Sequence, residues 1–414
     1  MADLQPPRGT YDLLPADQRR HARVTEGAYQ IAGLYGYEEM STPIFEATDV
    51  FLRTLGETSD IVTKEMYVFA DKKGRSLTLR PEGTAGVARA FISHLRSEPL
   101  PLKLFYQGPM FRYERAQKGR QRQFHQFGVE LLGVSEPVGD VEVISMGAHI
   151  LDALGVADKV TLQLNTLGDS DTRQAYHSKL VNYLEGHKDK LSEDSRTRLD
   201  RNPLRIFDSK DEGDRDVVAE APLLADHLND ASKAFFDDVK AGLEATGIAF
   251  ALNPRLVRGL DYYCHTAFEF VTDTLGAQGA VLAGGRYDGL IKTMGGPEIP
   301  GIGWAAGVER LALMIAEPPQ SPRPIAIMPD GDDAKTQVLS EAQRLRRSGL
   351  KVDLGFSGNL KKRMMRADKA NAVAAVIIGG DALAKGKAVV RDMETGEQTE
   401  VPLSSLEDHL ARYR

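Results

Sequence analysis

The chain contains very little cysteine and no long apolar run, and each shortage excludes a class of protein. Its single cysteine, Cys264, excludes an internal disulfide and any zinc site built from several cysteines. No apolar stretch reaches the roughly 18 residues that a membrane-spanning helix needs, and the N-terminus shows no apolar signal core. We therefore expect a cytoplasmic protein that has no membrane partner.

The size and charge of the chain indicate several domains with unequal charge. A length of 414 residues predicts two or three domains, and 42% hydrophobic with 27% charged residues is typical of a globular protein. The net charge is −7, but residues 323–414 carry 16 Lys or Arg and 13 Asp or Glu, a balance of +3. The remainder therefore has a balance of −10. A basic C-terminal part favours RNA or another polyanion as a partner, because phosphate contacts depend on local charge.

A proline-rich run, EPPQSPRP at 317–324, predicts a linker, because neither a helix nor a central strand tolerates four prolines in eight residues. Beyond it, apolar runs predict strands at 324–329, 351–356 and 372–380. Amphipathic patterns predict helices at 332–350 and 359–372, and residues 387–402 read as a hairpin. Alternating strands and helices indicate a small α/β domain with a parallel sheet.

The first part of the chain is predicted to be an α+β domain that a helical insertion interrupts. Residues 165–250 are polar and helical in pattern, with few β-branched runs. The flanking segments are rich in strand signals joined by hairpins, which favours a mostly antiparallel sheet with flanking helices.

A basic hairpin is the most informative local feature. Between two strand-like stretches, the segment Phe105–Glu130 carries five basic residues: Arg112, Arg115, Lys118, Arg120 and Arg122. Arginine forks match phosphate oxygens, and Phe124 could stack on a purine, so the hairpin suits a polyphosphate. The alternative is an exposed basic hairpin tip.

Three further segments carry polar residues where chemistry could take place. In TLRPEGTA, Glu82 and Thr84 stand where a helix begins and could hold an ammonium group, although a plain helix cap is the alternative. In RGLDYY, adjacent tyrosines on a strand face opposite sides, so we expect only one of them to enter a given pocket. In GWAAGVERLALMI, Arg310 begins an apolar helix after a glycine-rich run.

Taken in this order, the segments resemble the class II aminoacyl-tRNA synthetases and, within them, the histidyl-tRNA synthetase family. FRYERAQKGRQRQFHQFGVE looks like the second class motif, and GWAAGVERLALMI looks like the third. TLRPEGTA and RGLDYY are similar to signatures specific for histidine. PRGTYDLLP near the N-terminus and RADKANA near the C-terminus extend the resemblance from about residue 7 to the end.

The resemblance implies a domain organisation and an activity. The catalytic α+β domain would span residues 1–164 and 251–318, the insertion 165–250, and an anticodon-binding α/β domain 323–414. The implied reaction is the ATP-dependent ligation of L-histidine to its tRNA through a histidyl-adenylate, with release of AMP and pyrophosphate. The implied partners are histidine, ATP with bound Mg²⁺, the tRNA and a second copy of the chain, with no tightly held protein-bound metal.

The resemblance also implies residue roles. Arg258 and Arg112 would be catalytic, and Glu130 and Tyr263 would recognise the imidazole. Histidine would be bound by Glu82, Gly83, Thr84, Gln126, Glu130, Arg258, Tyr262 and Tyr263. ATP would be bound by Arg112, Glu114, Arg120, Phe124 and Arg310.

These roles agree with the chemistry. A carboxylate that attacks an α-phosphate is already ionised at neutral pH, so no side-chain base is required, and arginines would stabilise the developing negative charge.

The nine histidines show no zinc spacing, and His125 is expected to be a packed strand residue. Cys264-His265-Thr266 departs from the Asn-Arg-Thr that the family often has. We expect Cys264 to face away from the pocket and to serve packing.

Two alternatives stay open, and one surface suggests a dimer. The chain could be a regulatory, histidine-sensing relative that binds without activating, or a class II synthetase for another amino acid. The apolar segment Tyr29–Phe51 predicts a homodimer interface, although burial against the chain's own sheet would also explain it.

Overall fold

The computed structural model describes residues 4–56, 59, 61–117, 119–209, 211–258, 260, 262–276, 279–315, 317 and 320–413. The chain divides into two compact units, Met1–Pro319 and Gln320–Arg414. Each unit has hydrophobic clusters of its own. No helix in the described residues is both long enough and apolar enough to cross a bilayer.

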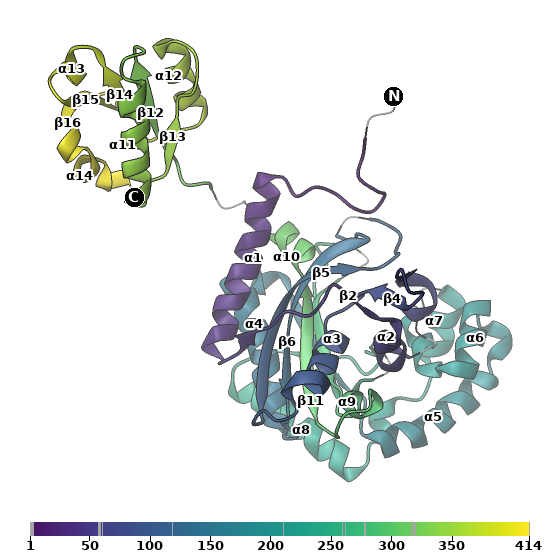
Figure 1. Cartoon of the computed structure of the whole chain (residues 1–414). Helices are drawn as coiled ribbons and strands as arrows, with labels where there is room; N and C mark the ends of the chain where they lie inside the picture. Colours follow the sequence, from purple (N-terminus) through teal and green to yellow (C-terminus); the bar gives the residue numbers. More distant parts are fainter. Residues whose placement is uncertain are drawn as a thin grey trace. The chain divides into compact units, whose positions relative to one another are not determined.

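The first unit is built on an eight-stranded sheet (Figure 1). Its order is β1 (Glu38–Glu39), β5 (Leu102–Phe111), β6 (Gln123–Leu132), β11 (Gly301–Gly307), β10 (Ala280–Arg286), β9 (Cys264–Val271), β7 (Thr161–Thr166) and β8 (Ala251–Leu252). All pairs are antiparallel except the outermost ones, β1 with β5 and β7 with β8. The prediction of a mostly antiparallel sheet is confirmed.

Side chains alternate along the strands, so the two faces of the sheet pack against different helices. One face, which includes Phe127, Val129 and Leu131 of β6, belongs to the main core cluster. The helices of that cluster are α1 (Pro15–Leu34), α4 (Pro137–Ala153), α8 (Asp230–Ala245) and α10 (Val308–Met314). The opposite face packs against α3 (Thr84–Ala90), the π-helical turn η2 (Phe91–Leu95) and α9 (Leu290–Thr293).

A small three-stranded sheet carries the segment that leads into α3. Its order is β2 (Phe45–Ala47), β4 (Ser76–Leu79) and β3 (Tyr67–Ala70), and all pairs are antiparallel. Between these strands lie α2 (Thr48–Leu55) and the π-helical turn η1 (Ile61–Glu65). Pro81 and Gly83 separate β4 from α3, as the sequence predicts.

Residues 165–250 are helical, as expected. They form α5 (Ser170–Glu185), α6 (Glu193–Arg201), α7 (Glu212–Ala219) and α8, with short 3₁₀ turns between them. Tyr176, Leu180 and Leu184 of α5 share a separate cluster with residues of the α6 and α7 segments. The last helix, α8, instead contributes Val239 and Leu243 to the main core.

The second unit is a five-stranded sheet with helices on both faces. Its order is β13 (Val352–Leu354), β12 (Ile325–Asp330), β14 (Ala374–Gly379), β15 (Lys387–Asp392) and β16 (Gln398–Pro402), with the first three parallel and the last two antiparallel. One face packs against α11 (Lys335–Arg347) and α14 (Leu406–Leu410), and the other packs against α12 (Leu360–Lys369). A short helix, α13 (Gly380–Ala384), precedes β15. The predicted α/β domain is confirmed.

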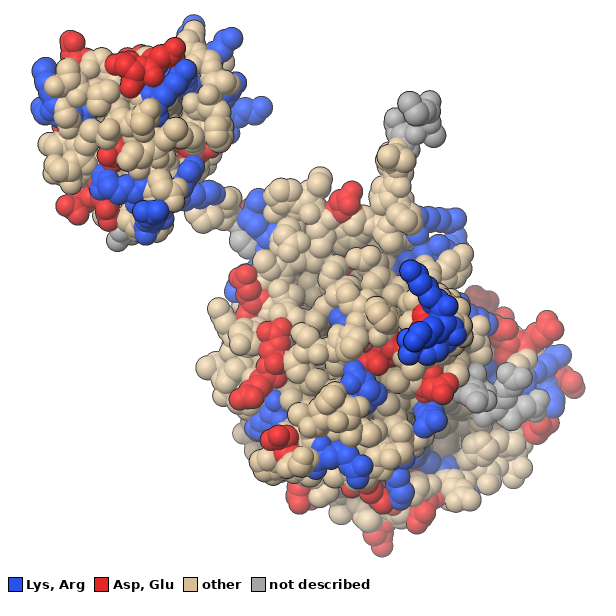
Figure 2. Space-filling view, viewed as in Figure 1, with Lys and Arg blue, Asp and Glu red and all other residues tan. Residues whose placement is uncertain are grey.

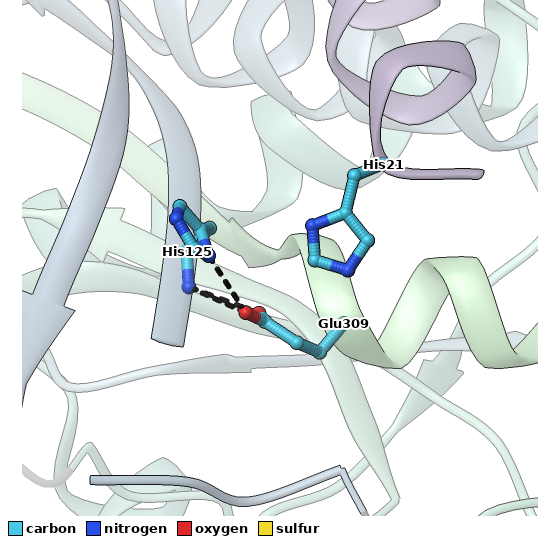
Figure 3. Close-up of side chains that lie close together, drawn as sticks. All are labelled: His21, His125 and Glu309. Atoms are coloured by element: carbon cyan, nitrogen blue, oxygen red, sulfur yellow. Dashed lines mark hydrogen bonds and ion pairs between the residues drawn. The ribbon is translucent and has the colours of Figure 1, made fainter. Parts of the chain in front are cut away.

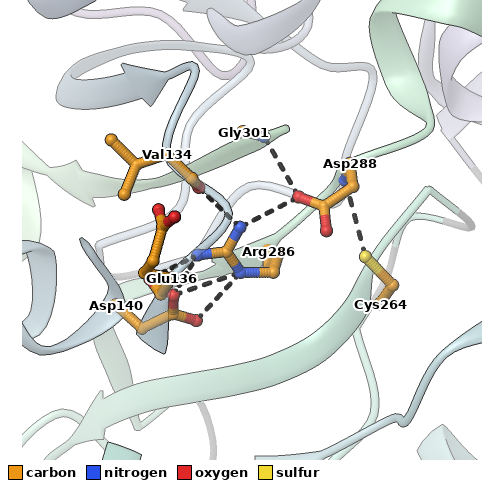
Figure 4. A network of polar contacts seen from close by, with 7 residues as sticks. All are labelled: Val134, Glu136, Asp140, Cys264, Arg286, Asp288 and Gly301. Atoms are coloured by element: carbon orange, nitrogen blue, oxygen red, sulfur yellow. Dashed lines mark hydrogen bonds and ion pairs between the residues drawn. The ribbon is translucent and has the colours of Figure 1, made fainter. Parts of the chain in front are cut away.

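A buried ion pair joins the strands of the main sheet to α4. Arg286, at the end of β10, and Asp140 of α4 are both fully buried and ion-paired (Figure 4). The Arg286 guanidinium also donates to the Val134 carbonyl at 2.9 Å and to Asp288 at 3.1 Å, and Asp288 accepts from the Gly301 amide at 3.2 Å. Because an unpaired buried charge is costly, this network holds the end of β10, the start of α4 and the start of β11 together.

Candidate active site

A cavity of about 530 Å³ opens on the α3 face of the main sheet. Its floor consists of residues of β6, β9, β10 and β11, and its rim comes from the β5–β6 loop, the start of α3, the segment before β9 and the start of α10. Most of the residues predicted to bind histidine or ATP line it: Glu82, Thr84, Arg112, Glu114, Arg120, Phe124, Gln126, Arg258, Tyr262, Tyr263 and Arg310.

Glu82 and Thr84 meet at the start of α3. The two carboxylate oxygens of Glu82 accept from the backbone amides of Thr84 and Ala85, each at 2.7 Å, so Glu82 satisfies donors of the first helical turn. Burial raises the pKa of Glu82, although these hydrogen bonds lower it. The helix-cap alternative therefore describes Glu82 correctly, and the same residue also lines the cavity.

Glu130 lies behind the cavity wall. Its oxygens accept from Thr84 Oγ1 at 2.7 Å and from the Tyr287 hydroxyl, and its side chain is 1% exposed. Burial raises the pKa of Glu130 to about 8, although the hydrogen bonds from Tyr287 and Thr84 lower it. A Cβ at Gly303 would lie 1.9 Å from a Glu130 oxygen, so only glycine fits opposite this carboxylate.

Like Glu130, Gly83 is not one of the described residues that line the cavity. A Cβ at this position would lie 2.1 Å from the Tyr106 ring, so Gly83 allows the chain to pass close to that ring. Its role in the structure is to bring Glu82 and Thr84 to the cavity.

Arginines concentrate at the other end of the cavity. The Arg112 side chain donates to the Pro81 carbonyl at 2.9 Å and lies over the Phe124 ring, 5.4 Å from its centroid. Arg120 pairs with Glu114, and Arg310 donates to carbonyls of Gly119 and Ala280. Burial lowers the pKa of Arg310, and the Arg120 guanidinium adds to this effect. An anionic ligand would relieve that repulsion.

Arg258 has a partner that the sequence did not reveal. It pairs with Glu269 of β9, and its guanidinium lies 5.2 Å from the Tyr263 ring centroid. Burial alone would lower the pKa of Arg258, but Glu269 and Tyr263 leave it raised. The signal for Glu269 was present, since it is a charged residue inside an otherwise apolar strand run, TAFEFV.

The expectation that only one of Tyr262 and Tyr263 enters the pocket is wrong. β9 begins at Cys264, so the two tyrosines precede the strand and do not alternate across it. Their rings lie 4.6 Å apart between centroids, and both line the cavity. Cys264 is buried, and its sulfur accepts from the Asp288 amide at 3.4 Å, as expected for a packing residue.

The five basic residues of the hairpin do not act together. Arg112 and Arg120 line the cavity, whereas Arg122 stacks on Tyr113 at 3.8 Å and Arg115 is exposed. Lys118 lies outside the described residues, as do Gly259 and Asp261 of the RGLDYY segment.

Some buried polar atoms of the cavity residues have no hydrogen-bond partner in the described part of the chain, among them Arg258 Nε and Gln126 Oε1. The buried Gln126 Oε1 has no hydrogen bond within the described part of the chain. Since buried polar atoms are almost always paired, this acceptor indicates a place for a ligand donor.

The comparisons with known proteins agree with this site. A family model described as histidyl-tRNA synthetase matches residues 9–311, and one described as an anticodon binding domain matches residues 325–413. The chain is 61% identical over 414 residues to a histidine–tRNA ligase of Rhodospirillum rubrum, covering all of both chains. It is 55% identical over 406 residues to one of Gluconobacter oxydans, covering 98% of each.

Solved structures give the same result. The apo histidyl-tRNA synthetase of S. aureus matches with a TM-score of 0.84 and 37% identity over 98% of this chain and 99% of that chain. A Bacillus halodurans structure described as an ATP phosphoribosyltransferase regulatory subunit/histidyl-tRNA synthetase shares the fold, with a TM-score of 0.60 at 21% identity over 87% of this chain and 96% of that one.

The antiparallel sheet, the arginine-bearing hairpin and the helix that starts beside Arg310 are the features of a class II aminoacyl-tRNA synthetase. Within that class, the chain belongs to the histidyl-tRNA synthetase family.

The raised pKa of Glu130 makes the stability of the ligand-free protein depend on pH. Between the unperturbed value of 4.5 and about 8, the unfolded chain has lost this proton and the folded chain keeps it. Glu130 therefore lowers the free energy of unfolding as pH rises through this window, by at most about 1.4 kcal/mol per pH unit. We expect Glu130→Gln to flatten the loss of stability between about pH 6 and about pH 7.5.

Urea unfolding followed by the fluorescence of the single tryptophan, Trp304 in the first unit, measures this. Glu136→Gln removes an exposed carboxylate and serves as the control. Parallel pH profiles for the parent and Glu130→Gln would contradict the prediction.

Proposed function

We propose that the chain activates L-histidine with ATP and transfers the histidyl group to its tRNA. The observation that carries this proposal is the cavity, which combines four arginines with buried acceptors for a small polar substrate, in a chain that matches its family over nearly the whole length. Histidine and ATP are small enough to share a site of about 530 Å³ in extended contact with its walls.

In this proposal the amino acid binds at the α3 end. Glu82, Thr84 and the unpaired Gln126 oxygen bind the α-ammonium group. Glu130 and Tyr263 recognise the imidazole, since a carboxylate has free lone pairs beyond those used by Thr84 and Tyr287. Other amino acids would leave these buried groups unpaired, and such sites discriminate by roughly 10⁴ or more.

ATP occupies the arginine end. Phe124 stacks on the adenine, Glu114 and Arg120 contact the nucleotide, and Arg310 binds the γ-phosphate. Arg112 and Arg258 lie where the substrate carboxylate and the α-phosphate meet. They hold the two anions together and stabilise the charge that develops as pyrophosphate leaves. Mg²⁺ enters with the ATP phosphates, so chelation of Mg²⁺ is expected to stop the reaction.

The C-terminal unit binds the anticodon in this proposal. It has a basic helix, α12, with Lys361, Lys362 and Arg366 exposed, and Phe356 before it is 81% exposed. Figure 2 shows basic side chains spread around the visible face of this unit. Exposed aromatic and basic groups suit unstacked RNA bases and their phosphates.

A regulatory relative that only senses histidine is the second candidate, because such a protein shares the fold. The retained arginines, Arg112, Arg258 and Arg310, support catalysis instead. The reaction also requires tRNA, so the proposal places the protein in the cytoplasm. Cell fractionation tests that location.

Replacing Arg258 by Ala is expected to lower histidine-dependent ATP–pyrophosphate exchange by about 10² to 10³, because its cation acts on charge formed in the transition state. Histidine affinity, measured by calorimetry, should change by less than about threefold. Arg255→Ala is the matched control, since Arg255 lies outside the cavity lining and donates to carbonyls of Val218 and Ala219. An Arg258→Ala rate within threefold of the parent would reject the role.

A fragment ending at Gln320 is expected to keep histidine-dependent exchange and to charge tRNA poorly. The two units have separate hydrophobic clusters, so the adenylate chemistry should survive the truncation. Both activities are compared with those of the full chain at equal concentration. Normal charging by the fragment would show that the anticodon is read elsewhere.

A homodimer is proposed from exposed apolar residues on the small sheet. Phe51 and Tyr37 are buried within the chain, but Phe45 is 51% exposed and Phe69 is 42% exposed, and the centroids of these two rings lie 6.1 Å apart. Such neighbouring exposed side chains suit a two-fold interface. Sedimentation at micromolar concentration should give twice the single-chain mass, and Phe45→Asp should shift it toward one chain. Phe356→Asp, on the other unit, is the control, and a single-chain mass for the parent defeats the dimer.

A further inference from the structure

Two histidines and a glutamate from distant parts of the chain meet behind the candidate active site. His21 belongs to α1, His125 to β6 and Glu309 to α10, and their side chains face one another (Figure 3). His125 lies between Phe124 and Gln126 in the strand, so its side chain emerges on the opposite face of the sheet from theirs. His21 and His125 therefore lie outside the lining of the candidate active site, whereas Glu309 also reaches that cavity.

The three side chains are close enough to share an ion. One ligand atom from each, two ring nitrogens and a carboxylate oxygen, all lie within 4.8 Å of one another. Glu309 Oε1 is 2.8 Å from His125 Nδ1, and both Glu309 oxygens lie 2.9 Å from the His125 backbone nitrogen. The His21 and His125 rings meet edge to face with centroids 5.7 Å apart.

His21 is the member whose position is otherwise unexplained. It is 7% exposed, and in the described part of the chain no group forms a hydrogen bond with either of its ring nitrogens. A neutral imidazole has the lone pair that a metal ion needs.

We propose that His21, His125 and Glu309 form a binding site for a divalent transition-metal ion, with Zn²⁺ as the preferred ion. Two imidazoles and one carboxylate with a fourth, open position are a ligand set that Zn²⁺ takes in proteins. At Zn–ligand distances of about 2.1 Å, tetrahedral ligand atoms lie about 3.4 Å apart. The widest separation, at most 4.8 Å, would therefore shorten by up to about 1.4 Å as the ion enters, and the 2.8 Å between His125 Nδ1 and Glu309 Oε1 would lengthen if Nδ1 is the ligand.

An adjacent cavity provides the route for the ion and the fourth position. A space of about 460 Å³ is lined by His21 and Glu309, and also by Tyr11 and Asp17. Asp17 lies one turn before His21 on the same face of α1, so either its carboxylate or a water completes the coordination. One Glu309 oxygen can bind the ion while the other keeps the His125 amide, since a carboxylate accepts on both oxygens.

A bound ion would connect three elements that position the candidate active site. An ion held here links α1 to β6 and α10 directly behind Phe124, Gln126 and Arg310. The sequence did not predict it, because the ligands are separated by more than one hundred residues and show no metal-binding spacing.

The test measures metal binding by the full chain after treatment with a chelator. Zn²⁺ is titrated in competition with a chromophoric chelator, and we expect one tight equivalent per chain that Mg²⁺ does not displace. His21→Gln should weaken this binding at least about 100-fold, since even the partners of metal ligands contribute 10- to 100-fold. His177→Gln, which removes an exposed histidine on α5, is the matched control and should bind as the parent does.

A second readout does not depend on the variant folding. Co²⁺ added to the metal-free parent should give the intense visible absorption of a four-coordinate ion, and X-ray absorption of the zinc form should count two imidazoles. Equal Zn²⁺ affinity in His21→Gln and the parent, no tight equivalent in the parent, or a weak six-coordinate Co²⁺ spectrum would each overturn the proposal.

Discussion

The alternation of side chains along β6 is the constraint on which the rest of the structure depends. Even-numbered residues such as Phe124, Gln126 and Glu130 face the cavity side, and odd-numbered ones such as Phe127 and Val129 enter the main core. A slip of one residue would exchange the two sets. Gly303 on β11 helps fix the register, because only a residue without a Cβ fits opposite Glu130. The binding site and the core are thus two results of one strand pairing.

Buried charge gives the site its chemical character. Arg286 and Asp140 neutralise each other and hold the sheet to α4, so this pair stabilises the frame that carries the cavity. Glu130 has two hydroxyl donors and no cationic side chain bonded to it among the described residues, and burial raises its pKa. Arg310 is a cation whose charged form is disfavoured, because burial and the neighbouring Arg120 both lower its pKa. The Glu130 end of the cavity therefore favours a hydrogen-bond donor, which suits an amino acid. The Arg310 end favours an anion, which suits the phosphates of a nucleotide.

Local patterns in the sequence predicted the local structure well. The antiparallel hairpin around the basic segment, the break before α3, and the five strands and two longer helices of the C-terminal unit follow from periodicity and from glycine and proline, whereas α13 and α14 were not predicted. The cavity residues named by resemblance also gather in one place, apart from Gly83 and Glu130, which lie behind its wall. What local patterns could not supply was pairing at a distance. Arg258 with Glu269, Arg286 with Asp140 and His21 with Glu309 depend on strand order and helix packing. The wrong prediction for Tyr262 and Tyr263 has a related cause. Side chains alternate only within a strand, and the sequence did not reveal that β9 begins after both tyrosines, at Cys264.

Neighbouring residues in two motifs make different contacts. Gln126 and Arg310 line the cavity, and the residues before them, His125 and Glu309, bond to each other, although Glu309 also reaches the cavity. The Glu309 carboxylate joins α10 to the backbone of β6, so it fixes the distance between the amino acid contacts and the Arg310 end. Precise placement of the reacting groups is worth large factors in rate, so under the proposed function Glu309 would act as a positioning residue through the backbone of β6.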